Sequence, residues 1–517
     1  MTDDNRGSQG NRGSSKIRAQ LLDSLRAASV TMLAALLTLA SALAIQPGAG
    51  SGVMAVVLAL SLSRSQLDRD RRGRIEAALI LPLVGLLAVS IAFLLVRYRW
   101  LGALLFVGGM FLSIWLRRFG AMTQRAGALI ALPFFALLTT PYIPSTSSIP
   151  APLVPVLIAL LALFWVSVVH ALAVRMHILQ AAPASVQSVA EKADSPLRPI
   201  ASTRMAIQMA MALMLSFVIG FMIFPERWSW IVLTTMIVLT GNRGRLDVAY
   251  KSVLRVIGAA AGTVIALSLS AAFHPQQFGS QMAVPLILLA MFLALWLRPL
   301  GYGWWALLIT IALALLQEMS GVTGGTLLLP RLEEILIGAV IGVATAWLVL
   351  PVRTTGVLRR QIALALAALS DALDPANEKR RSDEFIGALT KVALMLPSFR
   401  ASRLFTQTFL TLHPADWIDI LLACQSPAVA LIDAGQTPGD VRRAVGAARK
   451  VLREPADISA ALQNLRGALQ NAAQKTTQKT AQMQQEMDAK MEQEKLAQLV
   501  QPTGQEDTEH TRTVTGS

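Results

Sequence analysis

The sequence predicts an all-α integral membrane protein with about twelve transmembrane helices, followed by a helical cytoplasmic region. Three observations lead to this fold class. Hydrophobic residues make up 54% of the 517 residues and charged residues only 15%, against roughly 25% charged residues in an ordinary soluble domain. Long apolar stretches recur through the first two thirds of the chain. That part also holds most of the net charge of +15, since residues 1–353 carry +14 and residues 354–517 only +1. Positive charge beside apolar stretches indicates a lipid bilayer and argues against a nucleic-acid partner.

Each long apolar stretch is predicted to be a membrane helix, because about 20 apolar residues cross the hydrocarbon of a bilayer. Residues 51–63 and 228–241 are short for a straight crossing. We expect them to penetrate half-way or to be partly unwound, an arrangement that transporters use at binding sites. The predicted stretches are 27–46, 51–63, 76–96, 100–116, 126–141, 152–174, 205–224, 228–241, 254–273, 282–297, 303–317 and 332–352.

Basic residues predict the orientation of these helices. With the N-terminus inside, 23 Lys and Arg residues of the membrane part fall in inner segments and 4 in outer segments, which is a strong positive-inside bias. The stretch Ala42-Leu43-Ala44 resembles a signal-peptidase site, but the apolar run before it is longer than that of a signal peptide. We therefore expect an uncleaved first span and cytoplasmic N- and C-termini. The four outer residues are Arg97, Arg99, Arg227 and Arg331.

The two halves of the membrane part resemble each other at an offset of 178–180 residues. Six spans return the chain to the side where it began, so both copies run in the same direction and form parallel repeats. The predicted organisation is a cytoplasmic segment (1–25), a first repeat (26–176), a cytoplasmic linker (177–203), a second repeat (204–353), a cytoplasmic helical region (354–470) and a polar, largely disordered tail (471–517). The matched positions are Arg26 with Arg204, Leu67-Asp68 with Leu246-Asp247, and Arg118 with Arg298.

At offset 179, Arg255 of the second copy falls on Glu76 of the first. Opposite charges therefore occupy equivalent places where an inner loop enters a third span. A pair across the repeat axis would neutralise two costly charges, and two separately solvated side chains are the alternative.

The second repeat contains an ordered series of short motifs. Trp residues precede a short Thr-bearing span, an Arg-x-x-Gly-x-x-x-Gly stretch follows, and Arg-x-x-Glu-x-x-x-Gly comes later, before a terminal Pro. This order resembles the fusaric acid resistance family of membrane proteins, which includes bacterial aromatic acid exporters. The resemblance is good over about 205–353 and reaches 20–175 only through the repeat. The quoted residues are Trp228, Trp230, Thr234, Thr235, Arg255, Gly258, Gly262, Arg331, Glu333, Glu334, Gly338, Gly342 and Pro351.

The resemblance implies an inner-membrane protein with a substrate path in the second repeat, because the first repeat lacks the Trp and Arg-Gly motifs. Trp228 and Trp230 are predicted either to anchor at the headgroups or to stack on an aromatic substrate. Arg255 is predicted either to snorkel to the inner interface or to attract an organic anion from the cytoplasm. The remaining predicted path residues, Thr234, Thr235 and Thr310, are alternatively bonded to their own helix backbones.

A second set of residues is predicted to gate the path or couple it to protons. Arg331 and Glu334 stand at the outer start of the last span, and Glu318 ends the preceding span close enough to meet Arg331. Together with Glu76 they form the predicted gating set, with plain salt bridges as the alternative. Family members typically have an acid at the position of Glu334. The GxxxG pairs Gly258/Gly262 and Gly338/Gly342 are predicted to let helices pack closely.

No enzyme signature appears in the sequence. The five His and one Cys lack metal-ligand spacing, and no GxxxxGK[ST] stretch is present. We therefore expect no cofactor and no metal, and a secondary, proton-coupled efflux permease for small organic, including aromatic, anions. An organic-anion channel, as in the plant malate channels of the same family, and a non-transporting membrane scaffold remain alternatives.

The region after residue 353 is predicted to be helical, with one apolar stripe at Ile362, Leu366, Leu369 and Leu373 and another at Ile386, Leu389 and Leu396. It is expected to pack as a small bundle or in a homodimer. A frayed helix is predicted from about 471 to 499 and disorder after it. The resemblance also implies a separate periplasmic adaptor protein as a partner.

Overall fold

The computed structural model describes residues 4–64, 71–119, 121–139, 153–179, 200–272, 280–319, 324–377, 382–406, 413–452 and 458–499. These residues form α-helices and short connections, and no strand occurs among them, so the all-α prediction is confirmed. The chain divides into two compact units, Met1–Val357 and Leu358–Ser517.

The first unit contains a helix at each of the twelve predicted apolar stretches. Three of these helices begin well before their predicted starts. The first starts in the polar N-terminal segment, at Asp4, the ninth starts at Arg245 instead of 254, and the twelfth starts at Gly324 instead of 332. The helices are α1 (Asp4–Ile45), α2 (Ala49–Arg64), α3 (Arg71–Arg97), α4 (Arg99–Trp115), α5 (Ala121–Thr139), α6 (Leu153–Arg175), α7 (Ala201–Ile223), α8 (Trp228–Leu239), α9 (Arg245–Ala272), α10 (Ser280–Trp296), α11 (Tyr302–Met319) and α12 (Gly324–Leu348), with short 3₁₀ helices η2 (Leu116–Phe119) and η3 (Arg298–Leu300).

Six helical segments among the described residues are long and apolar enough to cross a membrane. Five belong to the first unit, whereas the sixth consists of two short helices of the second unit. Five further apolar helices are shorter, including α8, whose 12 residues span roughly 18 Å at 1.5 Å per residue against a hydrocarbon core of about 30 Å. The six are Arg18–Ile45, Arg99–Phe119, Leu153–Arg175, Ala201–Ile223, Arg245–Leu269 and Pro414–Asp433.

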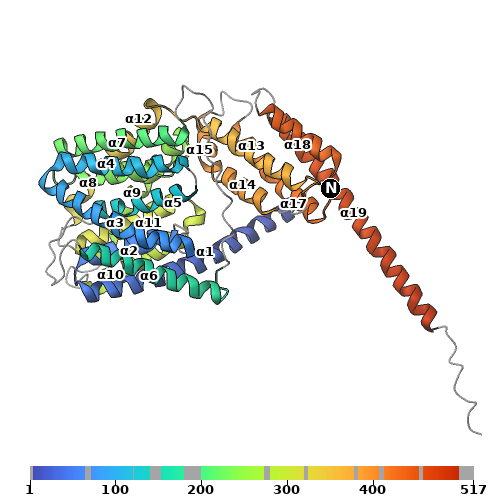
Figure 1. The fold of residues 1–517 in the computed structure, drawn as a ribbon, viewed down its shortest axis with the longest axis horizontal. Helices are drawn as coiled ribbons and strands as arrows, with labels where there is room; N and C mark the ends of the chain where they lie inside the picture. Colours follow the sequence, from blue (N-terminus) through green and yellow to red (C-terminus); the bar gives the residue numbers. More distant parts are fainter. Residues whose placement is uncertain are drawn as a thin grey trace, which may run out of the picture. The chain divides into compact units, whose positions relative to one another are not determined.

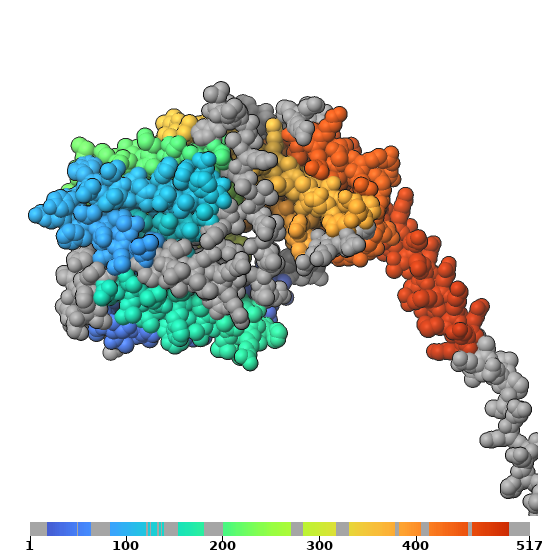
Figure 2. Space-filling model, in the orientation of Figure 1, coloured from blue at the N-terminus to red at the C-terminus, as the bar shows by residue number. Residues whose placement is uncertain are grey.

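Large apolar side chains lie exposed on the helices that Figure 2 shows on the near face of the first unit. Leu104 of α4 and Phe164 of α6 are each 55% exposed, and Phe93 of α3 equally so. Large exposed apolar side chains on helices that pack on one another, as α3 packs on α4 and α6, indicate contact with a partner or with lipid. Together with the long apolar helices, it identifies a multi-pass membrane protein.

Six helix pairings of α1–α6 have counterparts in α7–α12, whereas α3·α4 and α2·α5 have no close counterpart among the described residues. The pairs α1·α2, α1·α6, α2·α6, α3·α6, α3·α5 and α4·α5 correspond to α7·α8, α7·α12, α8·α12, α9·α12, α9·α11 and α10·α11. One contact between the halves is also reciprocal, because α4 packs on α7 as α10 packs on α1 (Figure 1). On the α1·α10 side, Ser24 donates to the Trp296 carbonyl at 2.8 Å, and the Trp296 indole donates to the Leu21 carbonyl at 3.2 Å.

The second unit is a group of helices with its own core. Ile362, Leu366 and Leu369 of α13 are fully buried, as the first predicted stripe requires. The second stripe is shifted, because Phe385, Leu389 and Val392 are the buried residues of α14, whereas Ile386 and Leu396 are only partly buried. The helices are α13 (Thr354–Ala372), α14 (Asp383–Ala393), α15 (Leu396–Thr406), α16 (Pro414–Ala423), α17 (Gln425–Asp433), α18 (Gly439–Val451) and α19 (Ile458–Leu499).

The boundary predicted at 470/471 falls inside one continuous helix, α19. The first part of this helix is anchored by buried Leu462, Leu465 and Leu469, and residues 478–495 are exposed. The change of composition therefore marks the end of packing and not the end of a helix. The predicted disorder after 499 lies outside the described residues.

His413 caps the first turn of α16 and is 6% exposed. Its Nδ1 accepts a hydrogen bond from the Ala415 N–H at 3.2 Å, and Asp416 accepts one from the His413 N–H at 3.2 Å. Burial lowers the pKa of His413, an effect that Asp416 opposes and Arg403 reinforces. The neutral imidazole is therefore the form that the folded unit holds.

We expect the second unit to lose stability as the pH falls below about 6.5, the unfolded pKa of His. The folded pKa is lower, so the unfolded chain binds the proton more readily and acid favours unfolding. His413→Asn should remove this dependence while keeping a cap worth about 1 kcal/mol. Hydrogen exchange of 414–423 in the full chain, compared between the two proteins at each pH, measures it. A difference in exchange rate between wild type and His413→Asn that stays constant from neutral to acidic pH would contradict the prediction.

Candidate functional site

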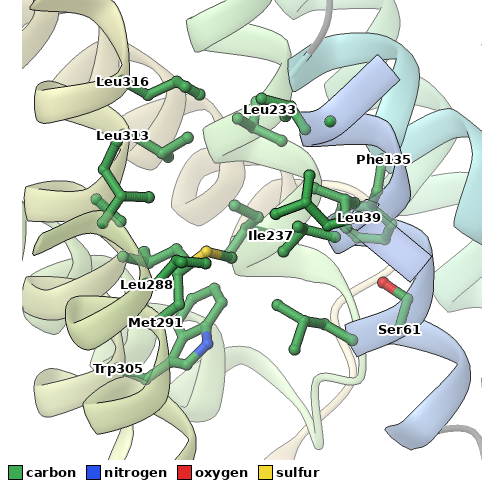
Figure 3. Close-up of a pocket in the computed structure, with 18 of the residues that line it drawn as sticks. Leu39, Ser61, Phe135, Leu233, Ile237, Leu288, Met291, Trp305, Leu313 and Leu316 are labelled. Carbon is green, nitrogen blue, oxygen red and sulfur yellow. The ribbon is translucent and has the colours of Figure 1, made fainter. Parts of the chain in front are cut away.

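The first unit contains a cavity of about 950 Å³ between the two sets of six helices. Helices α1, α2 and α5 of the first set face α8, α9, α10 and α11 of the second across it. Figure 3 shows Leu313, Leu316 and Leu288 facing Leu39 and Phe135 across the cavity. The lining residues are Leu39, Leu43, Gly48, Gly52, Val53, Val56, Val57, Leu60, Ser61, Phe135, Leu233, Ile237, Thr240, Lys251, Arg255, Val284, Ile287, Leu288, Met291, Arg298, Tyr302, Trp305, Ile309, Ala312, Leu313 and Leu316.

The cavity occupies the place of a helix contact that exists on the opposite side of the unit. There, α5 of the first set packs on α8 of the second. The corresponding pair is α11 with α2, and among the described residues these two helices do not pack closely but line the cavity. The cavity is therefore an opening at an interface that is closed in its counterpart.

Polar groups gather in the part of the cavity that is lined by the first half of α9, by η3 and by the start of α11. We call this the polar end and define it by Lys251, Arg255, Arg298 and Tyr302. The other end, which we call the apolar end, is lined by aliphatic residues, among them Leu43, Leu313 and Leu316. The described lining residues include three cations and no Asp or Glu. An apolar pocket with a few convergent polar groups is the usual form of a small-molecule site.

Arg255 is the most deeply buried charge at the polar end, with no exposed surface. Its Nη1 donates to the Thr310 hydroxyl at 3.4 Å, while Nε and Nη2 have no hydrogen-bond partner. The hydroxyl of Tyr302, within electrostatic reach of Arg255, is also buried without a hydrogen-bond partner. Within the described part of the chain, no carboxylate forms an ion pair with Arg255. Buried polar groups normally find partners, so these donors are suited to an incoming anion.

The depth of Arg255 bears on the two sequence expectations for it. Snorkelling assumed a helix that begins near residue 254, but α9 begins at Arg245. Arg255 therefore lies ten residues into the helix, roughly 15 Å along its axis. Its side chain is fully buried and lines the cavity, a position that favours the expectation of an anion site over that of a snorkelling side chain.

Of the other two cations of the polar end, one already has partners within the protein and the other is exposed to solvent. Lys251 lies 3.0 Å from an Asp247 carboxylate oxygen and donates to the Gly241 carbonyl at 3.3 Å. Arg298, in η3, is exposed. Arg255 is therefore the cation whose charge is least offset by protein or solvent.

Residues 209–345 match the family model described as fusaric acid resistance protein-like. This segment belongs to that family. It runs from α7 into α12 and includes Lys251, Arg255, Arg298 and Tyr302, so the polar end lies wholly within it. The family assignment supports a membrane transporter. A comparison with curated proteins finds no match.

A second buried charge cluster of the fusaric acid resistance-like segment does not line the cavity, although its Arg331 lies within electrostatic reach of Arg255. The Arg331 guanidinium stacks over the Trp230 ring, 4.1 Å from its centroid. Glu334 pairs with Arg227 at 3.3 Å. Arg331 and Glu334 are only 3% and 1% exposed. Because α12 begins at Gly324, both residues lie inside the helix instead of at its start. The sequence did not predict the Arg227 pair. The side chains of Glu318 and Glu76 lie outside the described residues.

The other predicted path residues pack within the segment and do not line the cavity. Trp228 contacts the rings of Phe217 and Phe221 at centroid distances of 5.4 and 5.3 Å. Thr235 receives a hydrogen bond from Ser216 at 2.8 Å and donates to the Gly338 carbonyl at 3.0 Å. Thr310 donates to the Ala306 carbonyl of its own helix at 2.7 Å. Of the six predicted path residues, the cavity brings together Arg255 and, through its hydrogen bond, Thr310.

The predicted GxxxG glycines lie at close helix contacts of the segment. A Cβ on Gly258 would lie 2.9 Å from the Ala306 Cβ, and one on Gly262 would lie 2.6 Å from the Leu307 carbonyl oxygen. These two glycines let α9 approach α11 and so bring Arg255 to Thr310. Gly338 and Gly342 lie where α12 packs on α8.

Sequence reasoning missed Tyr302 and every lining residue of α1 and α2. Tyr302 could have been suspected from its place beside Gly303 and Trp304 at the start of an apolar stretch. The α1 and α2 residues are ordinary aliphatic side chains, and nothing in their spacing distinguishes a cavity wall from a packed interface.

Proposed function

We propose that the protein is an efflux permease of the bacterial inner membrane that exports organic anions, with the cavity as their binding site. The observation that carries the proposal is a largely apolar cavity whose described lining has three cations and no acid, one of them a buried arginine with free donors. A carboxylate at Arg255 would gain charge-assisted hydrogen bonds. The apolar body of the same molecule would be buried along the leucines.

The recurrent helix pairings support two parallel repeats that move against each other around the cavity, as alternating access requires. The positive-inside bias supports cytoplasmic termini, which would direct the polar end toward the cytoplasm. An exporter would then bind its anion from that side. Proton coupling, a periplasmic adaptor and a homodimer formed through 354–470 remain predictions of the same proposal.

Transport by purified protein in liposomes tests the proposal. We expect saturable uptake of an aromatic monocarboxylate such as 4-hydroxybenzoate, stimulated by an imposed pH gradient. A cell that lacks the protein should become more sensitive to such acids, and the wild-type gene should restore growth. Ohmic currents without saturation would show that the protein is a channel and not a permease. If no acid becomes more toxic and no flux appears, the transport proposal fails and a scaffold role gains support.

A further inference from the structure

We propose that the ligand of this cavity is a single-chain anionic amphiphile, with its head at Arg255 and Tyr302 and its chain in the apolar end. This inference rests on the proposed function and adds the substrate class. Its basis is the length, lining and charge of the cavity.

The apolar part of the cavity is long. Along α11 the lining runs from Trp305 to Leu316, a separation of eleven residues, or roughly 16 Å at 1.5 Å per residue. Arg255 meets this helix at Thr310, so the six residues from there to Leu316, roughly 9 Å, lie beyond its guanidinium. The volume of about 950 Å³ lies near the upper limit of about 300–1,000 Å³ for sites of drug-sized ligands. A single-ring acid would fill only a small part of this space, and an unfilled apolar cavity forgoes the contacts that stabilise a complex.

The side chains of the apolar end favour an alkyl chain. Leu313 and Leu316 of α11 and Leu288 of α10 line one side of the cavity and face Leu39 of α1 on the other (Figure 3), and Gly52 and Val56 of α2 also belong to the lining. None of these side chains offers a hydrogen bond. Burial of methylene groups here contributes about 0.8 kcal/mol each, which corresponds to roughly a fourfold gain in affinity per methylene.

The same lining permits only one charge per ligand. The free donors of Arg255 and the Tyr302 hydroxyl lie at the polar end. A second carboxylate on the same chain would be placed among leucines without a partner, and burying an unpaired charge is very costly. Dicarboxylates long enough to carry their second charge into the apolar end should therefore bind poorly, and so should chains with a cationic head.

The test is a binding series on the full chain in nanodiscs, with labelled dodecanoate as the probe and empty nanodiscs as the control for partition into lipid. Competitors are hexanoate, octanoate, decanoate and dodecanoate, with dodecyl sulfate and dodecyltrimethylammonium to separate head charge from chain. We expect affinity to rise by roughly fourfold per methylene, dodecyl sulfate to compete and the ammonium compound to fail. Competition by dodecyl sulfate distinguishes general anion recognition from a site specific for carboxylates.

Two adjacent leucines of α10 provide a matched pair of variants. Leu288 lines the cavity, whereas Leu289 is 52% exposed on the outside of the helix. In Leu288→Trp the gain in affinity per methylene should end at a shorter chain length, while hexanoate still binds. Leu289→Trp should bind the whole series like the wild type. Tyr302→Phe should weaken all chain lengths by a similar factor.

The outcomes separate the two proposals. If hexanoate and aromatic acids bind and are transported but affinity does not depend on chain length, the amphiphile inference is wrong and the permease proposal stands. Equal effects of Leu288→Trp and Leu289→Trp would also overturn it. If no anion of any length binds or is transported, the proposed function fails with it.

Discussion

Arg255→Met is expected to weaken organic-anion binding strongly while making the protein more stable. The wild-type guanidinium is fully buried, and its described contacts include one hydrogen bond, to Thr310, and no carboxylate. Loss of charge-assisted hydrogen bonds worth about 1.5–3 kcal/mol predicts a loss of affinity of roughly tenfold or more. Replacing buried charge by an apolar side chain of similar volume often stabilises a fold by about 1–4 kcal/mol. Anion binding in nanodiscs and thermal unfolding of the same samples measure both effects.

Arg298→Met is the matched control for this prediction. Arg298 also lines the polar end but is exposed, and screened surface charges contribute about 0–1 kcal/mol. Its replacement should weaken binding only a few-fold and leave the melting temperature nearly unchanged. If Arg255→Met bound anions normally, or if both variants lost binding equally, the special role of the buried arginine would be disproved. Arg255→Lys should restore part of the binding, because the charge returns without the planar group of donors.

Gly338→Ala is expected to destabilise the membrane unit strongly. Its Cβ would lie 2.7 Å from the carbonyl oxygen of Ile231 and 2.9 Å from the Thr234 Cβ, so α12 and α8 would have to separate. The shift would also strain the hydrogen bond from Thr235 to the Gly338 carbonyl. Overpacking of this kind costs about 1–3 kcal/mol. Thermal unfolding and the yield of monodisperse protein after detergent extraction provide the measurement.

Gly342→Ala, one turn further along the same helix, is the control. A Cβ there would lie 3.3 Å from a methyl group of Val238, which a small side-chain movement can accommodate. Its melting temperature should stay close to that of the wild type. Equal shifts for the two alanine variants would show that the backbone contact at Ile231 does not decide the packing of these helices.

The sequence determined the class of fold because membrane helices follow from composition along one dimension. Apolar runs predicted a helix at each of twelve places, and helices occur there. Short motifs in order led to the family that the match at 209–345 supports. Helix starts were harder to predict than the helices themselves. Helix α9 extends through the polar residues before 254, and the error at its start misplaced Arg255 along the helix by more than two turns.

The candidate site could be predicted only in part, for a physical reason that Arg255 and Leu39 illustrate. A charge within an apolar helix is costly, so Arg255 was conspicuous in the sequence alone. Leu39 is one leucine among many, and it faces the cavity only because α2 and α11 stay apart where α5 and α8 close. The sequence by itself determined a basic, helical membrane protein with an unusual arginine. Only the tertiary structure decided that this arginine lies at one end of a long apolar cavity, because a cavity arises from helices far apart in the chain that fail to pack.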